Sequence, residues 1–502
     1  MITNWIILII SSIALIAIGY WSQLKIKEGA SEGFLLGAKS IGAFVGAGTL
    51  MATGYSGWGF IGSPGTTYAY GAIEIFANFF FAPAITFGTL FFAGFMRSRA
   101  EESGGFTVPE YIAKTHHGSD KQKRIVHGFG GIATFVFLSV YIIGQIRAIG
   151  LVGSQWLGIS EHTASIILMI VIIIFTVQGG LLAVAITDTI MCIGMLIASV
   201  IVYLTIVKDI PMLELIQKVG EIKPEFINPD TSVPYGNAKY SVFLVFIYAF
   251  LFTTTLPYMS VRFLSFKKNV NIPLMSLYMA PMGIILSLVP IAGLYMFYKN
   301  PNLQNPDSAM PVFLTTYLHP AIGGMIILFI LFAMLSTISS VLQALASSLS
   351  HDLVVSITNK PEKSSPMTNR LGVIFTGVWG LILTYLAPQG MLNKIAYIGT
   401  GGLIAMFVGP IMMRTIVKAN ITSALLSMIV GLVTSTIFIL KLNIGWVEAP
   451  IFAGLIGSGV YIVYGFLANG MKRIPEEDKI KESENNIQNN NNKKIEEAEE
   501  TL

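Results

Sequence analysis

The sequence is poor in charge and has almost no cysteine. Only 12% of its 502 residues are charged, whereas 54% are hydrophobic and the mean hydropathy is +0.70. Soluble globular domains carry about 25% charged residues, so the composition excludes an ordinary soluble protein and indicates a polytopic membrane protein. The one cysteine, Cys192, lies in an apolar run, which excludes an intrachain disulfide framework and a paired-cysteine metal site.

Signatures of several enzyme and pump classes are also missing. No glycine-rich phosphate loop follows a strand pattern, which argues against an ATP-driven pump. No nucleophile triad is apparent, and the histidines lack metal-ligand spacing, so we expect no zinc site. These histidines lie in expected loops or near helix ends: His116, His117, His127, His162, His319 and His351. The net charge of +4 does not indicate nucleic acid as a partner. No obligate protein partner is evident, and we expect a protein that is not an enzyme.

Apolar runs long enough to cross a bilayer occupy nearly the whole chain. A spanning helix needs about 20 apolar residues. We therefore expect an all-α integral membrane domain over residues 1–470 with about thirteen transmembrane helices. The expected spans are 5–23, 40–62, 70–95, 126–156, 163–178, 181–207, 240–265, 273–297, 321–350, 370–388, 393–415, 421–440 and 448–467. The charged, Asn-rich segment 471–502 cannot build a core, so we expect a disordered cytoplasmic tail.

Lysine and arginine are distributed unevenly between alternate loops. With the N-terminus outside, the inner loops and inner helix ends hold most of them, among them Lys121, Arg262, Lys360, Arg414 and Lys418. The outer loops then hold only Lys208, Lys218, Lys223, Lys239, Lys299, Lys394 and Lys441. Because positively charged loops stay on the cytoplasmic side, we expect a multi-pass plasma-membrane protein with its N-terminus outside and its C-terminus in the cytoplasm.

The first of two interrupted spans lies in residues 40–71. This stretch is apolar enough to enter a membrane, yet its middle holds residues that disturb a helix: Gly54, Ser56, Gly57, Gly59, Gly62 and Pro64. Every backbone polar group in hydrocarbon needs a partner, so an unwound turn persists only where it lines a cavity in the protein. We therefore expect a broken helix whose free carbonyls contact a bound species.

The second interrupted span is 240–265, where three threonines precede Pro257. Proline removes a backbone donor and clashes with the preceding turn, so a break is expected near Thr253. Without the first helix, spans two to six and seven to eleven form two halves of opposite orientation, each beginning with an interrupted helix. This layout is typical of inverted-repeat secondary transporters, whose binding site lies between the broken helices. The alternative is that Gly and Pro are simply frequent in membrane helices.

Hydroxyl side chains are concentrated in the segment 333–348. Ser336, Ser339 and Ser340 lie on one face of the expected helix, with Thr337 beside them. Neutral oxygens of this kind suit a hard monovalent cation such as Na+, and unwound carbonyls near Gly54 would complete its ligand shell. Each hydroxyl alone could instead serve close helix packing.

Two charged residues well inside expected spans suggest functional roles. A bare carboxylate at Asp188 is costly in hydrocarbon, so it should pair, bind a cation or lie in a wet cavity. Its alternative role is to cap a helix or anchor a neighbouring one. Arg147 falls toward the outer half of its span, where it could contact a substrate carboxylate, pair with Glu74 or snorkel to the interface.

Six aromatic residues fall near the two breaks and could form the wall of a pocket. They are Trp58, Phe60, Tyr141, Tyr248, Phe252 and Tyr258. In membrane helices such side chains more often face lipid or the protein core.

Several linked segments resemble those of the sodium/solute symporter family, which includes sodium/proline, sodium/pantothenate, sodium/glucose and sodium/sialic acid transporters. They are EGFLLGAKSIG, ATGYSGWGFIGSPGTTYAYG, FTVPEYI, GGLLAVAITD, LPYMSVRFLSF and AMLSTISS, and the resemblance covers about residues 5–440. It implies a leucine-transporter-type (LeuT) 5+5 inverted-repeat core and sodium-coupled alternating access.

The resemblance also implies site residues. The family's main Na+ site corresponds here to backbone carbonyls and hydroxyls of Ala52, Tyr55, Ala333, Ser336 and Thr337. A second Na+ site, found in some members, resembles Asp188 with Ser336, Ser339 and Ser340. The family's substrate contacts come from the two broken helices and correspond here to Gly54, Ser56, Gly57, Trp58, Phe252, Thr255 and Tyr258.

The chain departs from proline-type members at two positions. Gly54 stands where they have an acidic residue, and Tyr258 stands where many have a histidine. The stretch LPYMSVRFLSFKK is closer to the pantothenate branch, and Arg147 would suit an organic acid. We therefore expect Na+-coupled symport of a small polar or anionic organic solute, pantothenate or another carboxylate included. The rivals are a proton-coupled symporter of an amino acid or similar solute, with Asp188 taking the proton, and a transporter-like membrane sensor.

Overall fold

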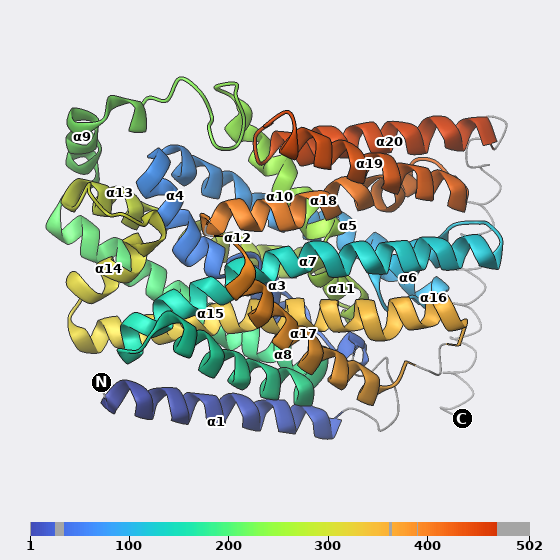
Figure 1. Ribbon diagram of the computed structural model, residues 1–502, viewed down its shortest axis with the longest axis horizontal. Helices are drawn as coiled ribbons and strands as arrows, with labels where there is room; N and C mark the ends of the chain where they lie inside the picture. The colour runs from blue at the N-terminus through green and yellow to red at the C-terminus, as the bar shows by residue number, and fades with distance from the viewer. Residues whose placement is uncertain (1, 26–34, 361–363, 389, 469–502) are drawn as a thin grey trace, which may run out of the picture.

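The computed structural model describes residues 2–25, 35–360, 364–388 and 390–468, and the regular elements of this part of the chain are all helices. Two isolated β-bridges, Ile41 with Phe266 and His117 with Asn420, are the β pairing found in it. The long helices run along the longest axis of the molecule (Figure 1). The expected tail, 471–502, lies outside the described residues.

Ten helical stretches of the described chain are long and apolar enough to cross a membrane, or eleven if one bent pair counts as a span. They are built from α1 (Ile2–Lys25), α5 (Ile73–Ser103), α7 (Asp120–Leu157), α8 (Glu161–Asp209), α12 (Ile272–Leu286) with α13 (Ile291–Lys299), α15 (Pro320–Ser347) with η6 (Ser348–Leu353) and α16 (Val354–Thr358), α17 (Pro366–Leu386), α18 (Leu392–Met412), α19 (Ile421–Leu440) and α20 (Glu448–Ala468). The bent pair is α10 (Leu244–Thr255) with α11 (Pro257–Ser265).

The expected number of thirteen spans is not confirmed. Two expected spans, 163–178 and 181–207, lie in the one long element α8, which is interrupted at Gly180 by a backbone conformation of φ 54° and ψ −164°. That region of backbone space is open to glycine almost alone. The expected span 40–62 is divided among α3 (Ala43–Gly54), η2 (Trp58–Gly62) and α4 (Ser63–Tyr70), and none of these is long enough to cross a membrane by itself.

Shorter elements gather at the two ends of the long helices. Figure 1 shows α9 (Met212–Ile222), α13 and α14 (Ala309–Thr316) at one end, hereafter the α9 end. It shows α6 (Val108–Thr115) and α16 at the opposite end, hereafter the α6 end. Single turns of 3-10 helix complete the described chain at Gly37–Lys39, Pro224–Phe226, Ser241–Phe243, Pro306–Ser308 and Met413–Thr415.

Both expected interruptions are present. The first helix stops at Gly54, Tyr55 has φ −106° and ψ 74°, and a π-helical turn resumes at Trp58. The second stops at Thr255, Leu256 is extended, and Pro257 opens α11 at an angle of 57° to the helix before it. Both breaks are buried, so their unpaired backbone groups face other protein groups rather than lipid.

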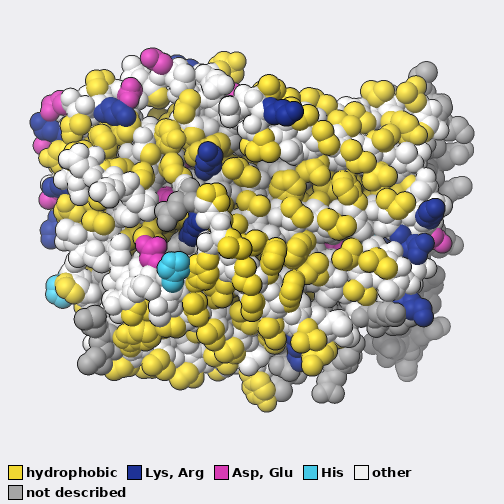
Figure 2. All heavy atoms as spheres, viewed as in Figure 1, with side chains coloured by type: hydrophobic (Ala, Val, Ile, Leu, Met, Phe, Trp, Pro, Cys, Tyr) yellow, Lys and Arg dark blue, Asp and Glu magenta, His cyan; other side chains and the backbone are white. Residues whose placement is uncertain are grey.

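The outer surface suits a bilayer. Figure 2 shows hydrophobic side chains covering the middle of the visible face, with charged side chains more numerous toward the two ends. Large apolar side chains project from several long helices, for example Phe91, Leu455 and Val463, which are 60% exposed or more. Exposed apolar area of this extent on a soluble monomer would be a liability, whereas hydrocarbon solvates it.

Candidate functional site

The first break lies against the middle of α15. A side-chain carbon added to Gly57 would come within 3.0 Å of Met334 Cγ on α15 and of Gln145 Oε1 on α7. Any larger residue would push these side chains aside, so glycine favours this close approach. The helix α3, which ends at this break, also packs against α15, the helix that carries Ser336 and Thr337.

Several polar atoms at this contact have no partner. The hydroxyls of Ser336 and Thr337 are fully buried, and neither makes a hydrogen bond of standard geometry. In the described chain no backbone amide donates to the carbonyl oxygens of Ala52 or Tyr55. Unpaired buried polar atoms cost stability, so this group of oxygens is suited to a cation.

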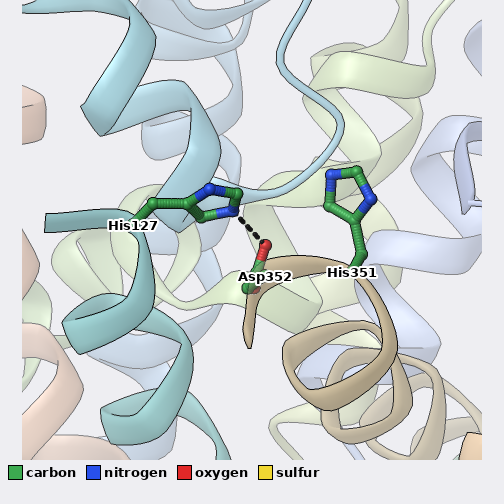
Figure 3. Close-up of side chains that lie close together, drawn as sticks. All are labelled: His127, His351 and Asp352. Carbon is green, nitrogen blue, oxygen red and sulfur yellow. Dashed lines mark hydrogen bonds and ion pairs between the residues drawn. The ribbon is translucent and has the colours of Figure 1, made fainter. Parts of the chain in front are cut away.

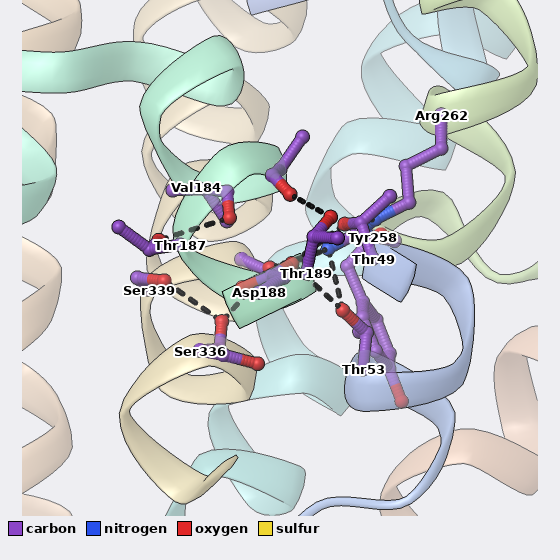
Figure 4. Close-up of polar contacts among 12 residues, drawn as sticks. Thr49, Thr53, Val184, Thr187, Asp188, Thr189, Tyr258, Arg262, Ser336 and Ser339 are labelled. Atoms are coloured by element: carbon purple, nitrogen blue, oxygen red, sulfur yellow. Dashed lines mark hydrogen bonds and ion pairs between the residues drawn. The ribbon is translucent and has the colours of Figure 1, made fainter. Parts of the chain in front are cut away.

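Asp188 lies next to the same oxygens and is paired with an arginine. Figure 4 shows Asp188 on α8 between threonines of α3 and serines of α15. Its Oδ2 atom lies 3.1 Å from Arg262 Nη2 and accepts hydrogen bonds from Thr49 at 2.6 Å and Thr53 at 3.3 Å. Its Oδ1 atom has no hydrogen-bond partner. Ser336 lies beside this carboxylate.

Arg262 corrects one expectation from the sequence. Counted there among the cations of inner loops and helix ends, it is fully buried. Its guanidinium donates to Thr49 at 2.7 Å, to Thr53 at 2.6 Å and to Ser340 at 2.7 Å, and also to the carbonyl of Tyr258. The reason is its position: Arg262 is only five residues beyond Pro257, too close to the break for its side chain to reach the end of the bundle.

Of the residues expected to form a second Na+ site, Ser339, Ser340 and one oxygen of Asp188 are already engaged in the described structure. Ser339 and Ser340 both donate to the carbonyl of Ser336, at 2.7 and 2.9 Å. Ser340 also accepts from Arg262, and Asp188 pairs with the same guanidinium. The positive charge next to Asp188 is therefore an arginine of the chain itself.

An aromatic pocket lies between the two breaks. Trp58 and Phe252 line it together with Phe81, Tyr141, Tyr248, Ala396, Tyr397 and Thr400. The Tyr248 hydroxyl is 2.6 Å from that of Thr400, so the wall has a polar part. The free space is about 10 Å³, which is room for about one water molecule, so the walls must separate before a solute can enter.

The other expected substrate residues lie around this pocket without lining it. Ser56 Oγ is 3.4 Å from the hydroxyl of Tyr141. A side-chain carbon at Gly54 would meet Ile85 of α5 at 2.7 Å, which shows that Gly54 faces a packed helix. Thr255 donates to the carbonyl of Leu251 at 2.7 Å, and the ring of Tyr258 stacks on Tyr141 with 5.4 Å between centroids.

Arg147 lies near the α9 end. It donates to three carbonyls at the end of α17, those of Thr384, Ala387 and Pro388. It lines a cavity of about 720 Å³, separate from the aromatic pocket. Pairing with Glu74 was one alternative, and it is wrong: Glu74 accepts from the Asn78 amide at 2.6 Å, because both side chains lie on the same face of α5.

A cluster of histidines and carboxylates lies at the α6 end, although the sequence showed no metal-ligand spacing among the histidines. Figure 3 shows His127 of α7 facing Asp352, with His351 beside them, and the His127 Nε2 to Asp352 Oδ1 distance is 2.9 Å. His351 pairs with Glu110 of α6 at 2.9 Å. His127, His351 and Asp352 could together hold a metal ion. Sequence spacing hid this group because His127 lies on α7 and the other two lie on η6, more than 200 positions away.

Electrostatics tie this cluster to α6. Burial alone would raise the pKa of Glu110, but the His351 imidazole and the Lys114 ammonium lower it to about 2. Glu110 is therefore a carboxylate that accepts from the backbone amide of Phe106 at 2.8 Å. The cluster holds α6 against α7 and η6.

Sequence reasoning missed Arg262, Phe81, Tyr397 and Thr400 as members of the site. For Arg262 a signal was available, because it lies inside the apolar span 240–265 and close to a break. The others come from helices that carry no interruption, so only the packing reveals them.

Comparison with known proteins identifies a family and several relatives. The model of the sodium:solute symporter family matches residues 34–439. Sodium/proline symporter 2 of Staphylococcus saprophyticus is 26% identical over 403 residues, which is 78% of this chain and 77% of that protein. A sodium/proline symporter of Staphylococcus aureus is 24% identical over 408 residues, 78% of each chain.

Solved structures support the fold. A Na+-coupled sialic acid symporter in a substrate-bound outward-open state matches with a TM-score of 0.74 at 17% identity, over 93% of this chain and 97% of that one. MhsT in complex with L-phenylalanine matches with a TM-score of 0.51 at 15% identity, over 86% and 97%. With interrupted helices at both expected positions and a family match over most of its length, the chain belongs to the sodium:solute symporter family.

Proposed function

We propose that this membrane transporter couples the entry of a small polar or anionic organic solute to an inward Na+ gradient. One observation carries the proposal: the buried hydroxyls of Ser336 and Thr337 lack partners and lie beside an unwound segment whose carbonyls at Ala52 and Tyr55 accept no backbone bond. Hydroxyl and carbonyl oxygens are the ligands of hard cations. A Na+ ion held by these groups and the Ala333 carbonyl would satisfy them together.

The position of this site supplies a coupling mechanism. A cation there contacts the first broken helix and α15 at once, so it stabilises the state in which the two are close. Its loss loosens that contact. The ion changes the conformational equilibrium only through its differential affinity for the two states, and the inward gradient makes it bind from the outside and leave toward the cytoplasm.

The solute is proposed to bind in the aromatic pocket. Trp58 comes from the first break and Phe252 from the second, so separation of the two broken helices would open the pocket. Movement of the first broken helix away from α15 would open the ion site as well. The Tyr248 and Thr400 hydroxyls and the free backbone at the break offer hydrogen bonds to a polar solute. A carboxylate such as pantothenate and an amino acid such as proline both belong to this class.

The contacts of Asp188 favour Na+ over a proton as the coupling ion. Its charge is balanced by Arg262 and stabilised by Thr49. Protonation of Asp188 would leave the buried guanidinium without a counter-ion, which is costly. A proton-coupled mechanism would therefore need a larger rearrangement than Na+ binding at Ser336 and Thr337.

The test uses purified protein reconstituted in vesicles. We expect uptake of labelled pantothenate or proline to require Na+ and to stop when choline replaces it. Combining Ser336→Ala with Thr337→Ala should raise the half-saturating Na+ concentration about tenfold or more, since two ligand oxygens are lost.

Thr176→Ala is the matched control. Thr176 is a buried hydroxyl on α8 that donates to the carbonyl of Ile172 and lies outside the candidate site. Uptake indifferent to choline, or an unchanged Na+ dependence in the double variant, would contradict the proposal. Loss of Na+ stabilisation in the double variant but not in Thr176→Ala, measured by thermal unfolding, would support it without knowledge of the solute.

A further inference from the structure

A basic cavity lies at the α6 end, between α5, α6 and the segment that follows α18. Its volume is about 270 Å³. Four cations and one acid are among the residues that line it: Arg99, Lys114, Arg414, Lys418 and Glu102. None of them belongs to the candidate Na+ site or to the aromatic pocket. An excess of positive charge in a concave site attracts anions.

Three hydrogen-bond donors of residues in the cavity wall have no partner in the described chain, and the Ser103 hydroxyl is one of them. Tyr111 is fully buried, and its hydroxyl makes no hydrogen bond. Arg414 donates from Nη2 to the carbonyl of Thr115 at 2.8 Å, but its buried Nη1 has no partner. A ligand with several acceptor oxygens would accept hydrogen bonds from both Tyr111 and Arg414.

The other cations are held in place by contacts of their own. Arg99 pairs with Glu102 at 3.0 Å. Lys114 pairs with Glu110 at 2.8 Å and donates to the carbonyl of Gly104 at 2.9 Å. These contacts hold two positive charges in place at the cavity, whereas Nη1 of Arg414 remains able to donate to a ligand.

Apolar side chains adjoin the cavity. Phe95 forms part of its wall and lies under the Arg99 guanidinium, 5.9 Å from it. One turn away on α5, Phe91 is 67% exposed, and Ile416 in the segment after α18 is 64% exposed. Cationic side chains above exposed apolar ones are the arrangement expected where lipid headgroups meet hydrocarbon.

We propose that this cavity binds a phosphate group, carried by the headgroup of an anionic phospholipid or by free phosphate. Phosphate combines negative charge with several acceptor oxygens, which is the chemistry that arginine recognises best. Arg414 and Tyr111 donate hydrogen bonds to the phosphate oxygens, and the positive charges of Arg99 and Lys114 attract the anion. The exposed Phe91 and Ile416 would contact the acyl chains of a lipid ligand.

The test titrates the purified full-length protein in a neutral detergent at constant ionic strength. The probes are inorganic phosphate, dihexanoyl phosphatidylglycerol and dihexanoyl phosphatidylcholine, and the readout is the midpoint of thermal unfolding, which a ligand of the native state raises. The variants are Arg414→Gln and Tyr111→Phe. The control is Arg124→Gln, which removes the same charge from the first turns of α7 outside the cavity.

We expect saturable stabilisation by phosphatidylglycerol or by phosphate, weakened about tenfold or more in Arg414→Gln and less in Tyr111→Phe, and unchanged in Arg124→Gln. Stabilisation by the lipid alone identifies a headgroup as the source, and stabilisation by phosphate alone identifies the free ion. Three outcomes would overturn the proposal: no probe stabilises, phosphatidylcholine acts as strongly as phosphatidylglycerol, or Arg124→Gln loses as much affinity as Arg414→Gln. Tyr111→Phe keeps the buried ring, so the test stands even where Arg414→Gln does not fold.

Discussion

Neighbouring hydroxyls on α15 differ in what they contact. Ser339 and Ser340 donate to the carbonyl of Ser336, and Ser340 also accepts from Arg262. Ser336 and Thr337 make no such bonds. A sequence shows four hydroxyls of equal chemistry, whereas the structure separates two that are satisfied from two that lack a hydrogen-bond partner.

The carboxylate of Asp307, in the loop before α14, predicts a pH dependence. Its Oδ2 accepts from the backbone amide of Leu392 at the start of α18, at 3.0 Å, while its buried Oδ1 has no partner. Burial raises its pKa from 3.8 to about 7. The folded protein therefore holds this proton more tightly than the unfolded chain does, and the associated stability is complete below pH 3.8 and is lost as pH rises through about 7.

We expect Asp307→Asn to abolish this part of the pH dependence. The amide oxygen of asparagine still accepts from Leu392, and it carries no charge at any pH. The difference in unfolding temperature between variant and parent should grow in the variant's favour from pH 5 to pH 8. A constant difference across that range would contradict the assignment.

At the scale of elements, Asp188 and Arg262 join four helices. Asp188 lies on α8 and Arg262 on α11, and their hydrogen bonds reach α3 through Thr49 and α15 through Ser340. The pair thus connects both broken helices to the helix that bears the candidate Na+ ligands. A cation at Ser336 would lie beside Asp188, whose Oδ1 has no hydrogen-bond partner. Its charge would therefore interact with the Asp188–Arg262 pair.

Removing one partner of this pair should be severely destabilising. Arg262→Gln leaves a buried carboxylate without its counter-ion, which costs about 3–5 kcal/mol in comparable buried pairs. Arg262→Gln combined with Asp188→Asn removes both charges and should recover much of the loss. The measurement is the unfolding temperature of parent, single variants and double variant, analysed as a double-mutant cycle.

Two further results decide the interpretation of that cycle. Lys218→Gln removes a cation from an exposed pair with Glu221 and should change stability little. If the double variant were as unstable as the sum of the two single variants, Asp188 and Arg262 would not act as a pair.

For the whole molecule, the charge pattern predicts the orientation in the membrane. We expect the α6 end, with Lys121, to face the cytoplasm and the α9 end, with Lys218, to face outward. In a Cys192→Ser background, an impermeant maleimide added to intact cells should label Lys218→Cys and not Lys121→Cys. Lys121 is exposed and the Lys218 side chain is 42% exposed, so opened membranes should label both, and the reverse pattern in intact cells would invert the topology.

The sequence by itself determined the membrane class, the two breaks and the cluster of hydroxyls on α15. These features are local: apolar runs, a proline or glycine inside them, and hydroxyls at helical spacing act on the chain wherever it folds. It could not determine the number of spans, and the expected thirteen are not confirmed. Whether the run around Gly180 forms one span or two depends on the backbone conformation at that residue.

Only the tertiary structure decided which residues meet. Asp188 and Arg262 are 74 positions apart, and His127 and Asp352 are 225 apart. Helical periodicity relates residues only a few positions apart, so it cannot indicate that either pair is in contact. The same holds for the basic cavity, whose cations come from α5, α6 and the end of α18. Buried charges must be paired because hydrocarbon does not solvate them, but the choice of partner is made by helix packing.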